Sequence, residues 1–333
     1  MEEDFKQAWE VHFTPRKPDL SDEQIAAYEQ FALSNRKRAA EFIKSVQADL
    51  NYTFKDKRVL DIGSAYGGFV ILTAQLAAKA YGVEILQYLH DLALTNAEHE
   101  PGFIKLINMD ILDEHIFSEI ENRPFDLIIV NDVFEHIYTS TALFRRIREL
   151  SHHGTILYFA IPNGEAWQSI ENEGHLFKFG ISLLEPGAWP RDVNPFNIYY
   201  RPIEYYQLHF QYAGFRHLYI KVEENALSSC KDRIVEKFSE LEQKITNGSF
   251  VTNYQNNHGR HKFELLNQRL QEILKQNDLL KLHLSFDQSF WVGYATSEIN
   301  PNLEDKNDLI RIDLDTFHML ERKRLKRSWL KLW

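Results

Sequence analysis

The stretch "NDVFEHI" gathers three side chains that can do chemistry: Asp132, Glu135 and His136. Two carboxylates and an imidazole that converge at one strand end can hold a divalent cation, and mostly oxygen ligands favour Mg²⁺ over zinc. Without a metal, His136 can act as a general base or orient a substrate. A third reading is that these side chains only pack inside the fold. We therefore treat the three as candidate catalytic residues and candidate metal ligands.

A glycine-rich stretch, "RVLDIGSAYGGFVI", points to a bound ligand. Gly63 and Gly67 allow a sharp turn and let the backbone approach a ligand closely. The spacing differs from the G-x-G-x-x-G pattern of dinucleotide-binding loops, and the Lys-Ser/Thr pair of a P-loop is missing. Glu84 lies about 20 residues further on, where an acid can bind both hydroxyls of a ribose.

Strand-like and helix-like segments alternate along residues 58–162, as in βαβ units. "FDLIIVNDVF" is apolar on both faces, which is typical of a buried parallel strand. In such sheets ligands bind at the carboxyl ends of the strands, where Asp61, Glu84, Asp110 and Asp132 fall. We therefore predict an α/β fold with an open, doubly wound, mostly parallel sheet.

The motif "VLDIGSAYGG" resembles the first motif of class I S-adenosylmethionine-dependent methyltransferases, and the resemblance runs from about residue 58 to 222 and resumes at "FWVGYA". It implies an enzyme with a Rossmann-like, seven-stranded sheet and S-adenosylmethionine as the cofactor. The resemblance assigns the cofactor to Asp61, Gly63, Ser64, Ala65, Gly67, Glu84, Met109, Asp110, Ile111 and Asn131. Asp61 to Gly67 would hold the methionine part, Glu84 the ribose and Asp110 the adenine. The alternative is another doubly wound domain that binds a nucleotide or NAD.

"NDVFEHI" also resembles the Glu/Asp-x-x-Glu-His pattern of two methyltransferase groups. One group methylates a catechol-like hydroxyl in ubiquinone synthesis, and the other methylates the terminal ribose of small RNAs. The RNA group has a later histidine, for which His175 in "EGHLFKF" is the candidate. The metal set that this resemblance implies is Asp132, Glu135, His136 and His175.

These patterns favour O-methylation of a hydroxyl on a small molecule or a glycan, with assistance from Mg²⁺ or another divalent cation. An RNA ribose methyltransferase is the enzymatic alternative, although the net charge of −10 argues against a broad nucleic-acid surface, so we expect no nucleic-acid partner. A third reading is a catalytically silent, cofactor-binding partner subunit that docks through the helices of residues 226–282.

The chain divides into an N-terminal helical cap, a methyltransferase core with a lid loop, a helical insertion, a final core strand and a basic tail. The expected ranges are 1–50, 51–225 with the lid at 164–200, 226–285, 286–297 and 298–333. The tail could contact a membrane peripherally as an amphipathic helix or pack on protein, and the insertion could form a homodimer surface. A single cysteine, a polar start and no apolar run of about 18 residues predict a cytoplasmic protein.

Overall fold

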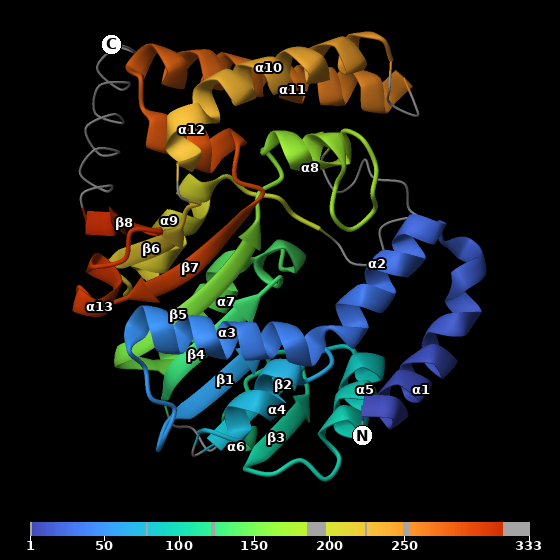
Figure 1. Ribbon diagram of the computed structural model, residues 1–333, viewed down its shortest axis with the longest axis vertical. Coiled ribbons are helices and arrows are strands. Elements are labelled where there is room, and N and C mark those ends of the chain that lie inside the picture. Colours follow the sequence, from blue (N-terminus) through green and yellow to red (C-terminus); the bar gives the residue numbers. More distant parts are fainter. Residues whose placement is uncertain are drawn as a thin grey trace.

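The computed structural model describes residues 2–77, 79–120, 124–184, 198–223, 225–248 and 253–315. One eight-stranded sheet forms its centre, with helices packed against both faces (Figure 1). The strands are β1 (Arg58–Ile62), β2 (Lys79–Glu84), β3 (Ile104–Asn108), β4 (Phe125–Asn131), β5 (Ser151–Pro162), β6 (His217–Lys221), β7 (Phe290–Thr296) and β8 (Leu309–Asp313).

The strand order is β3-β2-β1-β4-β5-β7-β6-β8. The pairings from β3 through β5 are parallel, whereas β7 pairs antiparallel with β5 and β6, and β8 pairs antiparallel with β6. The strand order reverses between β1 and β4, and this switch point is where an open α/β sheet binds its ligand. The predicted fold class is confirmed. The sheet has eight strands instead of seven because residues 309–313, expected within the tail, add an edge strand along β6.

The N-terminal helices are α1 (Glu2–Phe13), η1 (Thr14–Asp19), α2 (Asp22–Leu33) and α3 (Asn35–Leu50). Ser21 caps α2 and exchanges hydrogen bonds with Gln24, as a capping box does. The core adds α4 (Gly68–Ala74), α5 (Gln87–Ala97), α6 (Ile116–Glu119), η2 (Phe134–His136), α7 (Ser140–Leu150), α8 (Trp167–Glu171), η3 (Ile181–Leu183), α9 (Ile203–Tyr212) and α13 (Pro301–Glu304).

Alternate residues of β1 face different cores, which explains the two helical layers. Leu60 and Ile62 pack with the core that includes α7 and α9, whereas Val59 packs with the core that includes α3. Because both faces are covered, most residues of β1 and β4 are buried, and the apolar run that the sequence showed in β4 lies inside the sheet.

A helical insertion joins β6 to β7 and consists of α10 (Ala226–Thr246), α11 (Asn253–Gln276) and α12 (Leu279–Phe286). Its helices lie beyond the end of the sheet at which β5 finishes, with α10 and α11 side by side (Figure 1). They share an apolar core with α8 and η3. None of the helices in the described ranges combines the length and apolarity that a bilayer crossing requires. The basic segment 322–333 lies outside the described residues, as do residues 185–197 of the expected lid.

Candidate functional site

Strand β2 holds the glycine-rich loop after β1 in a tight turn. The N–H groups of Gly63 and Ser64 donate to the carbonyl oxygen of Val83 at 2.8 and 3.1 Å. Gly63 and Gly67 have φ of +72° and +77°, which explains glycine at both positions. A Cβ on Gly63 would also lie 2.4 Å from Cγ2 of Val133, so this glycine lets the loop pack against the segment after β4.

Ala65 takes a left-handed conformation with φ of +43°. The carboxylate of Glu84, which is 5% exposed, accepts the N–H of Ala65 at 2.9 Å and that of Leu86 at 2.8 Å. Each carboxylate oxygen has a second lone pair, so Glu84 retains capacity to accept from ribose hydroxyls. Burial raises the pKa of Glu84, and burial together with the charge of Glu84 raises the pKa of Asp61. A cationic ligand would relieve this concentration of buried acids.

The other expected cofactor residues lie at the same edge of the sheet. Asp110 is exposed after β3 and its Oδ1 accepts the N–H of Leu112 at 2.8 Å, while Ile111 is buried and Met109 half-buried. Asn131 ends β4 and donates from Nδ2 to Asp132 Oδ2 at 2.8 Å. These residues therefore extend across the ends of four neighbouring parallel strands.

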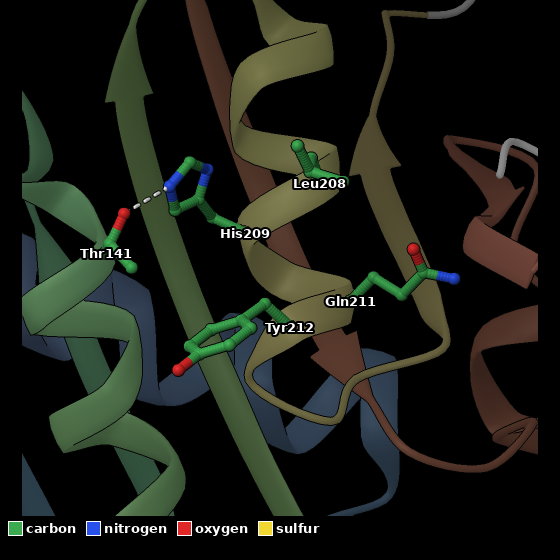
Figure 2. A pocket seen from close by; sticks show the side chains of 5 residues that line it. All are labelled: Thr141, Leu208, His209, Gln211 and Tyr212. Carbon is green, nitrogen blue, oxygen red and sulfur yellow. Dashed lines mark hydrogen bonds between the residues drawn. The ribbon is translucent and has the colours of Figure 1, made fainter. Parts of the chain in front are cut away.

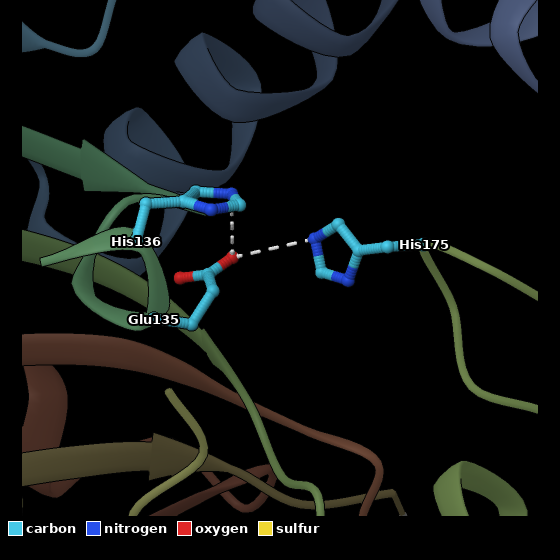
Figure 3. A group of neighbouring side chains, drawn as sticks. All are labelled: Glu135, His136 and His175. Atoms are coloured by element: carbon cyan, nitrogen blue, oxygen red, sulfur yellow. Dashed lines mark ion pairs between the residues drawn. The ribbon is translucent and has the colours of Figure 1, made fainter. Parts of the chain in front are cut away.

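Glu135 lies between two histidines immediately after β4 (Figure 3). Its Oε1 is 3.7 Å from Nε2 of His136 and 3.9 Å from Nε2 of His175. The three ligand atoms all lie within 4.8 Å of one another. The Glu135 side chain is fully buried, and neither carboxylate oxygen has a hydrogen-bond partner. Burial, with a contribution from the charge of Asp132, raises the pKa of Glu135 to about 8.

A buried carboxylate without partners is costly, and a bound cation would remove that cost. Asp132 lies close enough to interact electrostatically with Glu135 and His175, and its buried Oδ1 has no partner. However, it is outside the group of ligand atoms within 4.8 Å. The structure thus places Glu135, His136 and His175 together, with Asp132 beside them. The φ of Asp132 is +55°, a conformation that aspartate tolerates better than most residues.

Three further residues lie at the site, and two of them, Glu173 and Arg38, were not singled out in the sequence. Glu173 and Tyr200 contact the ring of His175. Arg38 of α3 interacts electrostatically with Asp132 and Asp61 and lies 3.9 Å over the ring of Phe31. The charge of Arg38 partly offsets the acids, but the stretch "SNRKRAAEF" gives no signal that one of its cations interacts with them.

The pocket around His209 and the side chain of Trp167 lie outside this site. His209 lines a pocket of about 450 Å³ with Thr141, Leu208, Gln211 and Tyr212, and its Nε2 forms a 2.9 Å hydrogen bond with Thr141 (Figure 2). No acid lines this pocket among the residues that the structure describes, so it offers no metal site. Trp167, which belongs to the lid range expected at 164–200, donates from Nε1 to Asp287 at 3.2 Å and packs against the insertion.

Comparison with known proteins gave a family match over more than half of the chain. A family described as a methyltransferase domain matches residues 34–219. No curated protein matches the chain significantly.

Several solved structures resemble this chain at low identity. Magnesium protoporphyrin IX methyltransferase from Synechocystis PCC 6803 is 16% identical over 56% of this chain and 76% of its own, with a TM-score of 0.41. Phosphoethanolamine N-methyltransferase 2 from Haemonchus contortus is 16% identical over 79% of this chain and 53% of its own, with a TM-score of 0.43. A protein from Galdieria sulphuraria described as a sarcosine dimethylglycine methyltransferase is 12% identical over 80% of this chain and 88% of its own, with a TM-score of 0.42.

Proposed function

Because the chain belongs to the methyltransferase domain family, we propose that this S-adenosylmethionine-dependent enzyme methylates a hydroxyl of a small molecule or glycan with the help of a divalent cation. The observation that carries the proposal is the unpartnered, fully buried carboxylate of Glu135 between His136 and His175. A metal-free methyl transfer would have little use for two imidazoles directed at one buried acid.

The cofactor would occupy the edge formed by β1 to β4. S-adenosylmethionine supplies a methyl group on a positively charged sulfur, and the buried acids Asp61 and Glu84 suit a cation at this edge. Glu84 would bind the ribose, while Asp110 and Ile111 would border the adenine. Arg38, close to Asp61, adds a positive charge that could bind the carboxylate of the methionine part.

The cation would be held by Glu135, His136 and His175. A set of two imidazoles and one carboxylate suits Mg²⁺ less well than the oxygen-rich set expected from the sequence, and Mn²⁺, a divalent cation that also accepts imidazole ligands, is the ion used in the tests. A metal there would supply a Lewis acid that lowers the pKa of the acceptor hydroxyl and fixes its direction. The chain's own contribution is to orient the two imidazoles and to exclude water from Glu135, so that the hydroxyl stands in line with the methyl group.

The first experiment is calorimetric titration of S-adenosylmethionine into the protein with Mn²⁺, with Mg²⁺ and with EDTA. Binding under all three conditions is expected, because the cation would touch the acceptor rather than the cofactor. Turnover is then measured on acceptors with vicinal hydroxyls, using Asp132→Ala and His136→Ala. We expect loss of turnover with cofactor binding intact; unchanged turnover in both variants would end the proposal.

The RNA alternative gains support from the position of His175 beside Glu135 and His136, since the resemblance to the small-RNA group requires a later histidine. Gel shifts with short RNAs at low salt, and methylation assays with intact or periodate-oxidised terminal riboses, would test it. Methylation of the intact RNA alone would favour RNA over a glycan. Co-purification with a second methyltransferase and no turnover alone would instead favour a silent partner subunit.

We also propose a cytoplasmic location, which fits the single, buried Cys230. A membrane contact through the tail and a homodimer through the insertion remain proposals that vesicle sedimentation and light scattering would test.

A further inference from the structure

We propose that Glu173 and Tyr200 form a buried support that fixes His175 with its Nε2 directed at Glu135. The inference rests on the proposed metal site and deepens it, because it assigns positioning residues behind one ligand. Both residues contact Nδ1 of the His175 ring, whereas Nε2 is the ring nitrogen that lies 3.9 Å from Glu135.

Glu173 is completely buried in the turn that follows α8. Its Oε1 accepts a hydrogen bond from Nδ1 of His175 at 2.8 Å and another from the hydroxyl of Tyr200. Its Oε2 accepts the main-chain N–H groups of His175 at 2.9 Å and Leu176 at 2.6 Å. Four donors therefore converge on one carboxylate. It can accept all four hydrogen bonds because each of its two oxygens accepts two of them.

This arrangement determines which nitrogen of His175 carries the proton. With Nδ1–H donated to Glu173, the neutral ring has its lone pair on Nε2, and Nε2 is the atom that lies 3.9 Å from Glu135 Oε1. Carboxylates behind metal-binding histidines commonly act in this way, by fixing the tautomer and the ring orientation.

Segments distant in the sequence hold the support in place. The hydroxyl of Tyr28, from the N-terminal helix α2, donates to the main-chain oxygen of His175 at 3.3 Å. The N–H of Tyr199 donates to the main-chain oxygen of Glu135 at 2.6 Å, which ties the segment of Tyr200 to the site. Gly164 leaves room for the ring of Tyr200, because a Cβ there would lie 2.3 Å from its Cγ.

The alternative is that Glu173 only closes its own turn, and Glu173→Gln separates the two roles. An amide has one acceptor and one donor end. If its oxygen stays on the two main-chain N–H groups, its NH₂ faces Nδ1 of His175. Nδ1 must then accept, so the proton moves to Nε2 and blocks the ligand position.

The test uses the full chain and two measurements. Long-range ¹⁵N–¹H NMR in EDTA, at a pH where the ring is neutral, reads the tautomer of His175, with His175→Asn assigning the signal. Calorimetry with Mn²⁺ alone reads the metal site. We expect Glu173→Gln to move the proton from Nδ1 to Nε2 and to weaken Mn²⁺ binding by about 10- to 100-fold.

The matched control is Asp287→Asn, because Asp287 also binds Nδ1 of a buried histidine, His283, at 2.9 Å. It should change neither the tautomer of His175 nor the Mn²⁺ affinity. A folded Glu173→Gln variant with the native tautomer and native affinity overturns the inference. If the wild type binds no Mn²⁺ but the tautomer still moves, the support stands and the metal site fails. If Glu173→Gln does not fold, Tyr200→Phe takes its place: we expect the native tautomer with Mn²⁺ binding weakened about threefold, and an unchanged affinity would overturn the inference.

Discussion

Two histidine–carboxylate pairs in this molecule share a hydrogen bond from Nδ1 of the histidine to a buried acid and differ in their surroundings. Glu173 binds Nδ1 of His175 at 2.8 Å, and Asp287 binds Nδ1 of His283 at 2.9 Å; both carboxylates are at most 3% exposed. In the insertion, Arg233 donates to both oxygens of Asp287 at 2.8 and 2.5 Å. The chain itself supplies the cation there.

At the candidate site, no guanidinium among the described residues is hydrogen-bonded to Glu135. Burial opposes ionisation of Asp287, but the hydrogen bonds from Arg233 and His283 outweigh it, so the pKa of Asp287 lies well below its ordinary value. Burial raises the pKa of Glu135 to about 8. A histidine–carboxylate pair is therefore structural where a guanidinium also binds the carboxylate, as Arg233 binds Asp287. It is poised for a cation where an unpartnered acid faces the other ring nitrogen.

The two pairs should differ most in how they make the free energy of unfolding of the metal-free protein depend on pH. Between pH 4.5 and about 8 the folded state keeps a proton on Glu135 that the unfolded state has lost, so the free energy of unfolding falls as pH rises. The upper limit of this loss is about 5 kcal/mol. The raised pKa of His175 acts in the same direction. Asp287 acts oppositely, because its stabilisation is lost only as pH falls below about 4.

Urea unfolding in EDTA at pH 5 and pH 8 measures this difference. Glu135→Gln should reduce the difference in the free energy of unfolding between the two pH values, because it removes the titrating acid. An equally large difference in the variant would mean that Glu135 is already ionised in the folded protein at pH 5.

The next largest effect concerns the metal site itself. Glu135→Gln removes a charged ligand, so we expect Mn²⁺ affinity to fall by more than about 100-fold, beyond the effect of a supporting residue. S-adenosylmethionine affinity should stay within error, because Glu135 lies on the acceptor side. Calorimetry measures both, and an unchanged Mn²⁺ affinity would contradict the ligand assignment.

Asp287→Asn should give the converse result. It leaves Arg233 and His283 without their carboxylate and should lower the free energy of unfolding by about 2 kcal/mol, since Arg233 is half-exposed and recovers hydration. Mn²⁺ affinity and turnover should not change. A loss of metal affinity in this variant would show that the two pairs are coupled.

The smallest expected effect is on Mn²⁺ affinity and concerns Tyr200, one of the two supporting residues. Tyr200→Phe removes one donor to Glu173 and should weaken Mn²⁺ binding about threefold, which corresponds to a hydrogen bond of about 0.7 kcal/mol. Tyr294→Phe is the control, because Tyr294 donates to the buried Asp49 at 2.7 Å, away from the site. Equal Mn²⁺ affinities in the two variants would indicate that Tyr200 only packs.

Much of the sheet and the acids at its edge could be predicted from the sequence, because buried parallel strands are continuous apolar runs with polar residues at their ends. Strand β8 was missed because "LIRID" is short and half-exposed, and only its pairing with β6 makes it a strand. Within the helical cap expected over residues 1–50, the helices α2 and α3 meet at Ser34.

The role of Glu173 could not be predicted, and a surface turn shows why. Asp113 accepts the N–H of His115 at 2.9 Å and its Nδ1 at 2.8 Å, which reproduces the local geometry of Glu173 and His175. His115 is nevertheless exposed, with its side chain 85% accessible. The acid-x-His pattern therefore builds the turn, whereas Tyr28 and Tyr200, both distant in the sequence, give it a buried position beside Glu135.

The connection between β6 and β7 has an evolutionary consequence. These strands are antiparallel neighbours, with Ile220 paired to Gly293, so a short hairpin turn would join them. The helical insertion replaces that turn, and Asn163 at the end of β5 anchors it by donating to the carbonyl oxygens of Leu284, Ser285 and Gln288. Since long insertions cost little loop entropy, this segment can diverge while the cofactor edge stays constant. Descendants of one ancestral sheet could thereby acquire different acceptors by remodelling a single hairpin.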